Sequence, residues 1–300
     1  MRSAECGIQN ESSLTPHPLL RTPHVRLVVL MMWLAWWFIF GTVIGSFLNV
    51  CVYRIPRDQS VVRPRSRCPA CHHPIAWYDN APLVSYVALR ARCRHCRARI
   101  HWRYPLVELL TGLLSVAVIA RFGVTLHGLS YLVFVWALIV VSFVDLEHRI
   151  IPFTISVGGL LLWLLLSLFA PQLHGTSYGL VGLGRSIFGA LIGCGLLYVT
   201  GSIGSFVFKK EAMGLGDVDL LAMAGALLGW KLVTLTFFLA PLLAVVPGLI
   251  VLYRKHDHEI PYGPFLALGL ILSIFFGGRL IQATGIEETM RMFWAYYAGS

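Results

Sequence analysis

The segment that decides the fold covers residues 126–149 and reads LHGLSYLVFVWALIVVSFVDLEHR. After Leu126 it continues for 18 apolar or neutral positions before the first charge, Asp145. A helix needs about 20 mostly apolar residues to cross the hydrocarbon core of a bilayer, so this run predicts a membrane-spanning helix. A carboxylate at the end of such a helix is costly to place near the membrane and is therefore a candidate functional residue.

Similar runs recur on both sides of this segment. Hydrophobic residues make up 57% of the 300 positions and charged residues only 13%, a composition that a soluble protein could not bury. The sequence predicts an all-α, polytopic integral membrane protein with seven or eight transmembrane helices, because the run 218–230 has only 13 residues. The other runs are 27–53, 105–120, 155–170, 186–208, 232–253 and 261–276.

The net charge of +10 is concentrated in one polar segment. Between Arg54 and Arg103 there are 11 arginines against two acids, Asp58 and Asp79. By the positive-inside rule this loop faces the cytoplasm. Its position divides the chain into segments. We expect an N-terminal tail, a first transmembrane helix, a cytoplasmic loop, a transmembrane catalytic domain and a C-terminal tail, at residues 1–26, 27–53, 54–104, 105–283 and 284–300.

Four of the seven cysteines form two C-x-x-C pairs inside this loop, namely Cys68, Cys71, Cys93 and Cys96. Two such pairs, here 21 residues apart, are typical of a tetrahedral four-thiolate zinc site. Two redox-active pairs or four unpaired thiols are the alternatives, but a reducing cytoplasm disfavours stable disulfides. We expect a structural zinc, because a loop with few apolar residues cannot fold around its own core. The nearby histidines are expected to be bystanders.

Two aspartates, Asp145 and Asp217, lie at the ends of predicted helices that the topology places at the same membrane face. Asp217 closes the sequence Gly214-Leu215-Gly216-Asp217, where the glycines are expected to allow an irregular backbone and close approach of a substrate. Two neighbouring aspartates share a proton, so that one activates water and the other protonates a carbonyl. The pair is our candidate catalytic site for peptide hydrolysis.

Three other acids near helix ends are less suited to this pair. Glu147 and Asp219 each lie two positions from a candidate aspartate, which on a helix points them about 200° away. We expect them to be interfacial charges. Glu108 starts another span, where Arg103 or another buried base is one candidate partner, and the sequence leaves its role open.

These motifs together resemble the type IV prepilin leader peptidases, over about residues 41–278. The resemblance rests on Gly45-Ser46-Phe47-Leu48-Asn49-Val50, the double C-x-x-C and Arg103-Tyr104-Pro105-Leu106-Val107-Glu108. It also rests on Asp145-Leu146-Glu147 before Ile151-Pro152, on Gly214-Leu215-Gly216-Asp217, and on Ile260-Pro261-Tyr262-Gly263-Pro264.

The resemblance implies that Asp145 and Asp217 are the catalytic aspartates and that the loop cysteines bind zinc. It further implies a bacterial inner-membrane enzyme with its active site facing the cytoplasm. Such an enzyme removes the leaders of prepilins and of type II secretion pseudopilins. It also methylates the new N-terminus with S-adenosylmethionine, although the chain has no Rossmann-type glycine fingerprint for that cofactor.

Other classes of protein remain as alternatives. A peptidase without methyltransferase activity is the first. An ion-coupled transporter would use the aspartates as a relay, but no inverted repeat is evident. A nucleic-acid binder would use the two C-x-x-C pairs and the 11 arginines, but the positive-inside rule already explains the arginines. We therefore expect membrane lipids and no nucleic acid as partners.

Overall fold

The computed structural model describes residues 23–209, 213–255 and 261–283, and within these ranges it contains helices and no named β-strand. The first half of the chain forms α1 (Pro23–Arg54), the short α2 (Val84–Ala88), α3 (Arg103–Phe122) and α4 (Leu126–His148). The second half forms α5 (Phe153–Phe169), α6 (Gly179–Phe208), α7 (Leu215–Lys255) and α8 (Gly263–Ala283). Short 3-10 helices lie at 55–57 (η2), 77–80 (η3) and 171–174 (η4).

Six of these helices are long and apolar enough to cross a membrane, namely α1, α3, α4, α6, α7 and α8, and α5 is a shorter apolar helix. The all-α membrane architecture predicted from the sequence is therefore confirmed. α1 begins at Pro23 and α6 at Gly179, both earlier than expected. The rest of the predicted N-terminal tail and the whole C-terminal tail lie outside the described residues.

The long helix α7 consists of two segments joined at Gly229, whose φ of 78° and ψ of 170° are not helical. Gly269 and Gly277 of α8 pack against Ala240 and Leu232 respectively, so the second segment runs antiparallel to α8. α7 is thus a hairpin of two apolar helices, and it accounts for the two adjacent runs expected at 218–230 and 232–253. Counting its segments separately gives eight apolar helices in the described chain.

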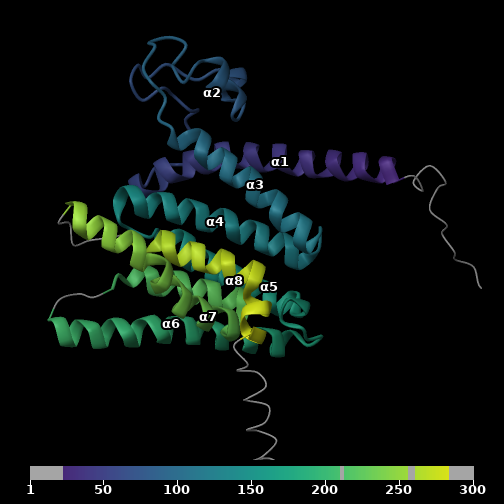
Figure 1. Cartoon of the computed structure of the whole chain (residues 1–300), viewed down its shortest axis with the longest axis vertical. Helices are drawn as coiled ribbons and strands as arrows, with labels where there is room; N and C mark the ends of the chain where they lie inside the picture. Colours follow the sequence, from purple (N-terminus) through teal and green to yellow (C-terminus); the bar gives the residue numbers. More distant parts are fainter. Residues whose placement is uncertain (1–22, 210–212, 256–260, 284–300) are drawn as a thin grey trace, which may run out of the picture.

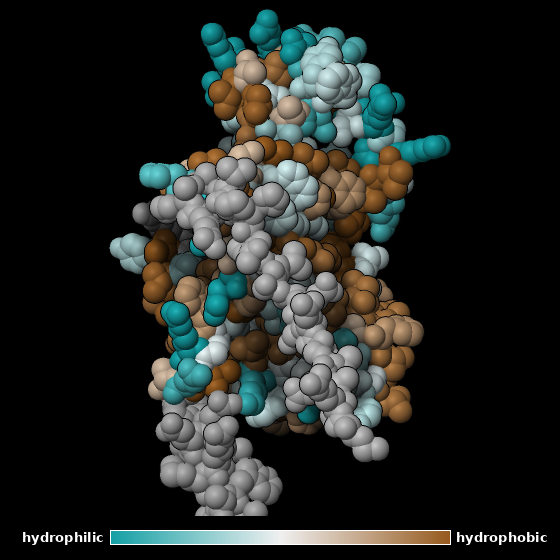
Figure 2. Space-filling model, turned by 90° about the vertical axis from the view of Figure 1, so that its right-hand side faces the viewer, coloured by the Kyte–Doolittle hydropathy of each residue, from teal (hydrophilic) through white to brown (hydrophobic). Residues whose placement is uncertain are grey.

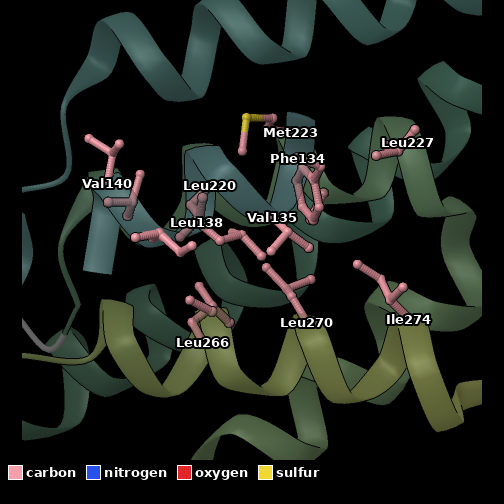
Figure 3. Packing of buried hydrophobic residues seen from close by; sticks show 14 of the residues in the cluster. Phe134, Val135, Leu138, Val140, Leu220, Met223, Leu227, Leu266, Leu270 and Ile274 are labelled. Carbon is pink, nitrogen blue, oxygen red and sulfur yellow. The ribbon is translucent and has the colours of Figure 1, made fainter. Parts of the chain in front are cut away.

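The core is formed where α4, the first segment of α7 and α8 meet (Figure 3). Phe134 and Leu138 of α4, Leu220 of α7 and Leu266 and Leu270 of α8 are all fully buried. Small residues bring the other helices close, since the backbones of Gly189 in α6 and Gly225 in α7 lie in direct contact. Such glycine contacts are typical of membrane helix interfaces, where packing rather than water exclusion holds helices together.

The loop between α1 and α3 lies on one flank of the helical bundle, next to α3 (Figure 1). Its surface carries many hydrophilic residues, whereas the surface of the bundle is largely hydrophobic (Figure 2). This division matches the one drawn from the charge pattern of the sequence.

Candidate active site and metal centre

Asp145 lies in the last turn of α4, where the helix is terminated. Arg149 takes a left-handed conformation with φ of 54° and donates its N–H to the Asp145 carbonyl at 2.9 Å. The chain then reaches Pro152, which precedes α5. The helix ends before that proline, which disfavours helix in the residue preceding it. The side chain of Asp145 is left at the bundle end, only 6% exposed.

The Asp145 carboxyl is held by the start of α8. Its Oδ2 accepts a hydrogen bond from the backbone N–H of Gly263 at 2.9 Å. A Cβ atom at Gly263 would lie 2.8 Å from the same oxygen, so this close approach requires glycine. The sequence motif around Gly263 does not reveal this role, because a backbone donor has no side-chain signature.

Asp217 lies in the first turn of α7, at the same end of the bundle as Asp145. The two carboxyl groups are close enough for their charges to interact. The structure thus brings the two predicted aspartates together from separate helices. Two consecutive residues at the start of α8 lie near the pair. Tyr262, which directly precedes α8, is within the electrostatic reach of Asp217, and Gly263 donates a hydrogen bond to Asp145.

Tyr262 is a residue that the sequence reasoning missed. Burial and the charge of Asp217 raise the pKa of its phenol to about 12, so the phenol stays neutral at physiological pH. A neutral phenol can donate a hydrogen bond beside the two carboxyl groups.

The expected irregular backbone around Asp217 is wrong for Gly216, which lies inside the helical first turn of α7. The glycine is needed there for packing instead, because a Cβ atom would lie 2.8 Å from Cβ of Ile151. This contact holds the start of α7 against the turn between α4 and α5, which positions Asp217 near Asp145.

The other acids have separate roles. Glu147 forms an ion pair with the buried Arg103 at the start of α3. Arg103 is therefore not the partner of Glu108, contrary to one expectation from the sequence. The Glu108 carboxylate instead accepts the backbone N–H of Leu83 at 2.8 Å, a partner 25 residues away that no local pattern could reveal. Asp219 is half-buried in α7.

The four loop cysteines form one cluster, with all four sulfur atoms within 4.8 Å of one another. The Sγ atoms of Cys68 and Cys96 are 3.8 Å apart. Four thiolates at a Zn–S bond length of about 2.3 Å have sulfurs separated by about 3.8 Å, so the cluster fits a zinc ion. Among the described residues, the metal-binding group consists of these four cysteines and contains no histidine.

Two similar turns present these sulfurs. In the first, Cys68 donates its N–H to the His73 carbonyl at 3.0 Å, and in the second Cys93 donates to Ala98 at 2.8 Å. Backbone N–H groups of Cys96 and His95 also point at the Cys93 sulfur. They lower its pKa to about 7, which favours the thiolate that binds metal.

The loop is tied to the aspartate end of the bundle. Besides the ion pair between Arg103 and Glu147, Arg57 at the end of η2 lies 3.4 Å from the ring of His148, which closes α4. Arg54, the last residue of α1, holds the first part of the loop by donating to the carbonyls of Ser60 and Pro64 at 2.8 and 2.7 Å. The cysteine cluster and the two aspartates are therefore parts of one connected structure.

Comparison with known proteins assigns the chain in two parts. Residues 39–122 match the bacterial peptidase A24 N-terminal domain, and residues 132–249 match the type IV leader peptidase family. No solved structure matches the chain.

Curated relatives match over most of the chain, and each of the following is named prepilin leader peptidase/N-methyltransferase. The Myxococcus xanthus protein is 43% identical over 215 residues, which cover 72% of this chain and 62% of the relative. The Aeromonas hydrophila protein is 36% identical over 82% of this chain and 91% of its own length. For the Pseudomonas aeruginosa protein the values are 35%, 81% and 90%. Because these relatives match over most of the chain and its helices bring the two aspartates together, the chain belongs to the type IV leader peptidase family.

Proposed function

We propose that this chain is a membrane-embedded aspartyl endopeptidase that removes the leader peptides of type IV prepilins and type II secretion pseudopilins. The observation that carries the proposal is the meeting of Asp145 and Asp217 at one end of an apolar bundle. The names of the relatives support prepilins as substrates. Pseudopilins follow from the resemblance described above.

The two aspartates divide the work of hydrolysis between them. The Gly263 N–H donates to Asp145 and orients its carboxyl group as a hydrogen-bond acceptor. Asp145 is therefore the general base that takes a proton from water, and Asp217 is the acid that protonates the substrate carbonyl oxygen. Attack of the water gives a tetrahedral intermediate with two hydroxyl groups. As the C–N bond breaks, the proton held by Asp145 passes to the leaving nitrogen, and Asp217 takes back a proton from the hydroxyl group that becomes the carbonyl of the new carboxyl group.

The surface around the pair suits a membrane-anchored substrate. Four apolar residues are exposed near the aspartates. They lie at the end of α4, in the turn that follows it, and at the starts of α5 and α7, and they are Leu146, Ile150, Phe153 and Leu215. A pilin-type substrate enters the membrane as an apolar helix that follows a polar leader. Cleavage just before that helix attacks a backbone with fewer hydrogen bonds to break.

The active site faces the cytoplasm in this proposal, and the protein is a multi-pass protein of the bacterial inner membrane. The support is the positive-inside rule, because 11 arginines lie between Arg54 and Arg103. The contacts of Arg57 and Arg103 with α4 place this loop at the same end of the bundle as Asp145.

Cys68, Cys71, Cys93 and Cys96 would hold a structural zinc ion. Bound zinc would supply folding free energy to the loop and take no part in peptide hydrolysis. The second activity, N-methylation of the new N-terminus, is proposed from the names of the relatives. S-adenosylmethionine would supply the methyl group.

The peptidase proposal is tested with purified protein, a prepilin substrate in detergent, and N-terminal sequencing of the product. Asp145→Asn and Asp217→Asn should each lower cleavage by about three orders of magnitude or more, because a catalytic pair acts as a unit. Asp219→Asn, on the same helix as Asp217, is the matched control and should retain most activity. Substantial cleavage by Asp145→Asn or Asp217→Asn would show that the replaced aspartate is not part of the mechanism.

A further inference from the structure

Three large apolar side chains of the loop are exposed, which is unfavourable if they face water. Trp77 of η3 is 85% exposed, and Val84 and Val87 of α2 are 69% and 75% exposed. Val84 and Val87 are three residues apart, so they lie on one side of this short helix. The three side chains belong to neighbouring elements of the loop, and we call them the loop apolar face.

The position of this face relative to the membrane helices is fixed by one hydrogen bond. Leu83, which directly precedes α2, donates its N–H to the Glu108 carboxylate at 2.8 Å. Glu108 lies five residues into α3, or about 7.5 Å along a helix that is long and apolar enough to span a bilayer. At this level α3 also packs against α1, where a Cβ atom on Gly45 would lie 2.7 Å from Cα of Glu108.

Because Glu108 is inside a membrane helix, α2 is held beside the bundle and does not extend away from its end. Figure 1 shows α2 on the flank of the bundle beside α3. The loop apolar face is thus kept near the level at which the hydrocarbon core meets the headgroups.

The charged residues of the loop are mostly positive. Nine arginines of the loop are exposed, and of these nine only Arg94 has an acidic partner among the described residues, Asp79, at 2.6 Å. Exposed apolar side chains surrounded by cations are the combination that binds the surface of an anionic bilayer. The remaining exposed arginines are Arg57, Arg63, Arg65, Arg67, Arg90, Arg92, Arg97 and Arg99.

We propose that the loop apolar face of Trp77, Val84 and Val87 inserts into the headgroup region of an anionic phospholipid bilayer. α2 has only five residues and would bind weakly by itself. The hydrogen bond to Glu108 supplies the missing affinity, because the tether keeps the face at the interface permanently. The loop that carries the four cysteines, which we call the metal loop, is then held at the membrane in two ways. Its ends continue into α1 and α3, and the loop apolar face contacts the lipid.

The test uses the full-length protein in nanodiscs that contain a phospholipid with a photoactivatable diazirine near the top of one acyl chain. Two discs differ only in the headgroup, which is phosphatidylglycerol in one and phosphatidylcholine in the other. After irradiation, mass spectrometry should find lipid attached to residues 77–89, several-fold more in the anionic disc. α1 exposes apolar residues such as Leu27 and Met32 and should be labelled in both discs.

Two sets of variants separate the face from its tether. Val84→Asp combined with Val87→Asp should lower labelling of residues 77–89 by about tenfold while labelling of α1 is unchanged. Glu108→Gln keeps an oxygen that accepts the Leu83 N–H and should behave like the wild type, whereas Glu108→Leu should lose labelling. Metal content is measured on every variant to show that the loop is folded.

The proposal is overturned if residues 77–89 remain unlabelled while α1 is labelled, which would leave the face for a protein partner. Equal labelling in both discs would overturn the requirement for anionic lipid. Equal labelling of the Gln and Leu variants would show that Glu108 does not hold the face in place.

Discussion

Gly263 shows how much of the site depends on a residue that carries no side chain. Its N–H reaches Asp145 because its Cα lies against the carboxyl group, and any larger residue would occupy that space. The aspartates themselves could be predicted, since carboxylates at the ends of apolar runs are conspicuous. Gly263 could not, because its function resides in a backbone group that every residue except proline has.

Replacing Gly263 by alanine should therefore damage catalysis without destroying the protein. The new Cβ atom would lie 2.8 Å from Asp145 Oδ2, so the carboxyl group has to move and its hydrogen bond is weakened. We expect cleavage of a prepilin to fall by about tenfold to a hundredfold, mostly in kcat, because misplacement by about 1 Å is enough for such a loss.

The matched control is Gly278→Ala in the same helix, since nothing lies within 4 Å of a Cβ atom there. Both variants should reach the membrane in wild-type amounts, as measured by detergent extraction and gel filtration. If the Gly263 variant cleaves at the wild-type rate, the bond from its N–H does not position Asp145.

Among the helices, α7 shows what hydropathy can and cannot predict. The sequence placed two apolar runs at 218–230 and 232–253, and the first is too short for a confident span. In the structure the two runs form one hairpin whose turn is a single glycine, Gly229. Its φ of 78° favours glycine, and the sharpness of the turn depends on packing against α6 and α8, which hydropathy does not record.

The metal loop was more predictable, because ligand spacing is written in the sequence. The two C-x-x-C pairs identified all four sulfurs that the structure brings together. The attachment of the loop was not predictable. The ion pair between Arg103 and Glu147 joins residues 44 positions apart, and the bond from Leu83 to Glu108 depends on a backbone donor.

Loss of one thiolate should unfold this loop and leave the helices in place. We expect Cys68→Ser to lower bound zinc from one ion per chain to a small fraction, measured by plasma emission spectrometry of the purified protein. Because zinc supplies much of the folding free energy of such a loop, limited trypsin treatment should then cut after its exposed arginines.

Cys194→Ser is the control, since this cysteine lies in α6 and outside the metal-binding group. It should keep the zinc and the protease resistance. Full zinc content in the Cys68 variant would mean that Cys68 is not a ligand.

The molecule as a whole separates a metal loop on one flank from an aspartate pair at the bundle end, and the two are connected through α3 and α4. Such a division would allow the two proposed reactions to be carried out by different parts of one chain. In the proposed mechanism, peptide hydrolysis needs the two carboxyl groups. Methylation needs a deprotonated amine held in line with a sulfonium methyl group, a task for which a shared-proton pair has no special use.

We therefore expect the two activities to be separable by mutation. The amine appears only after cleavage, so Asp217→Asn should fail to methylate a full-length prepilin. The same variant should transfer labelled methyl from S-adenosylmethionine to a substrate supplied already trimmed, at a rate within about threefold of wild type. Wild-type protein with the trimmed substrate is the control. No transfer by the wild type would reduce the chain to a peptidase alone. Transfer by the wild type but not by Asp217→Asn would place the methylation site at the dyad itself, because the substitution leaves the rest of the molecule unchanged.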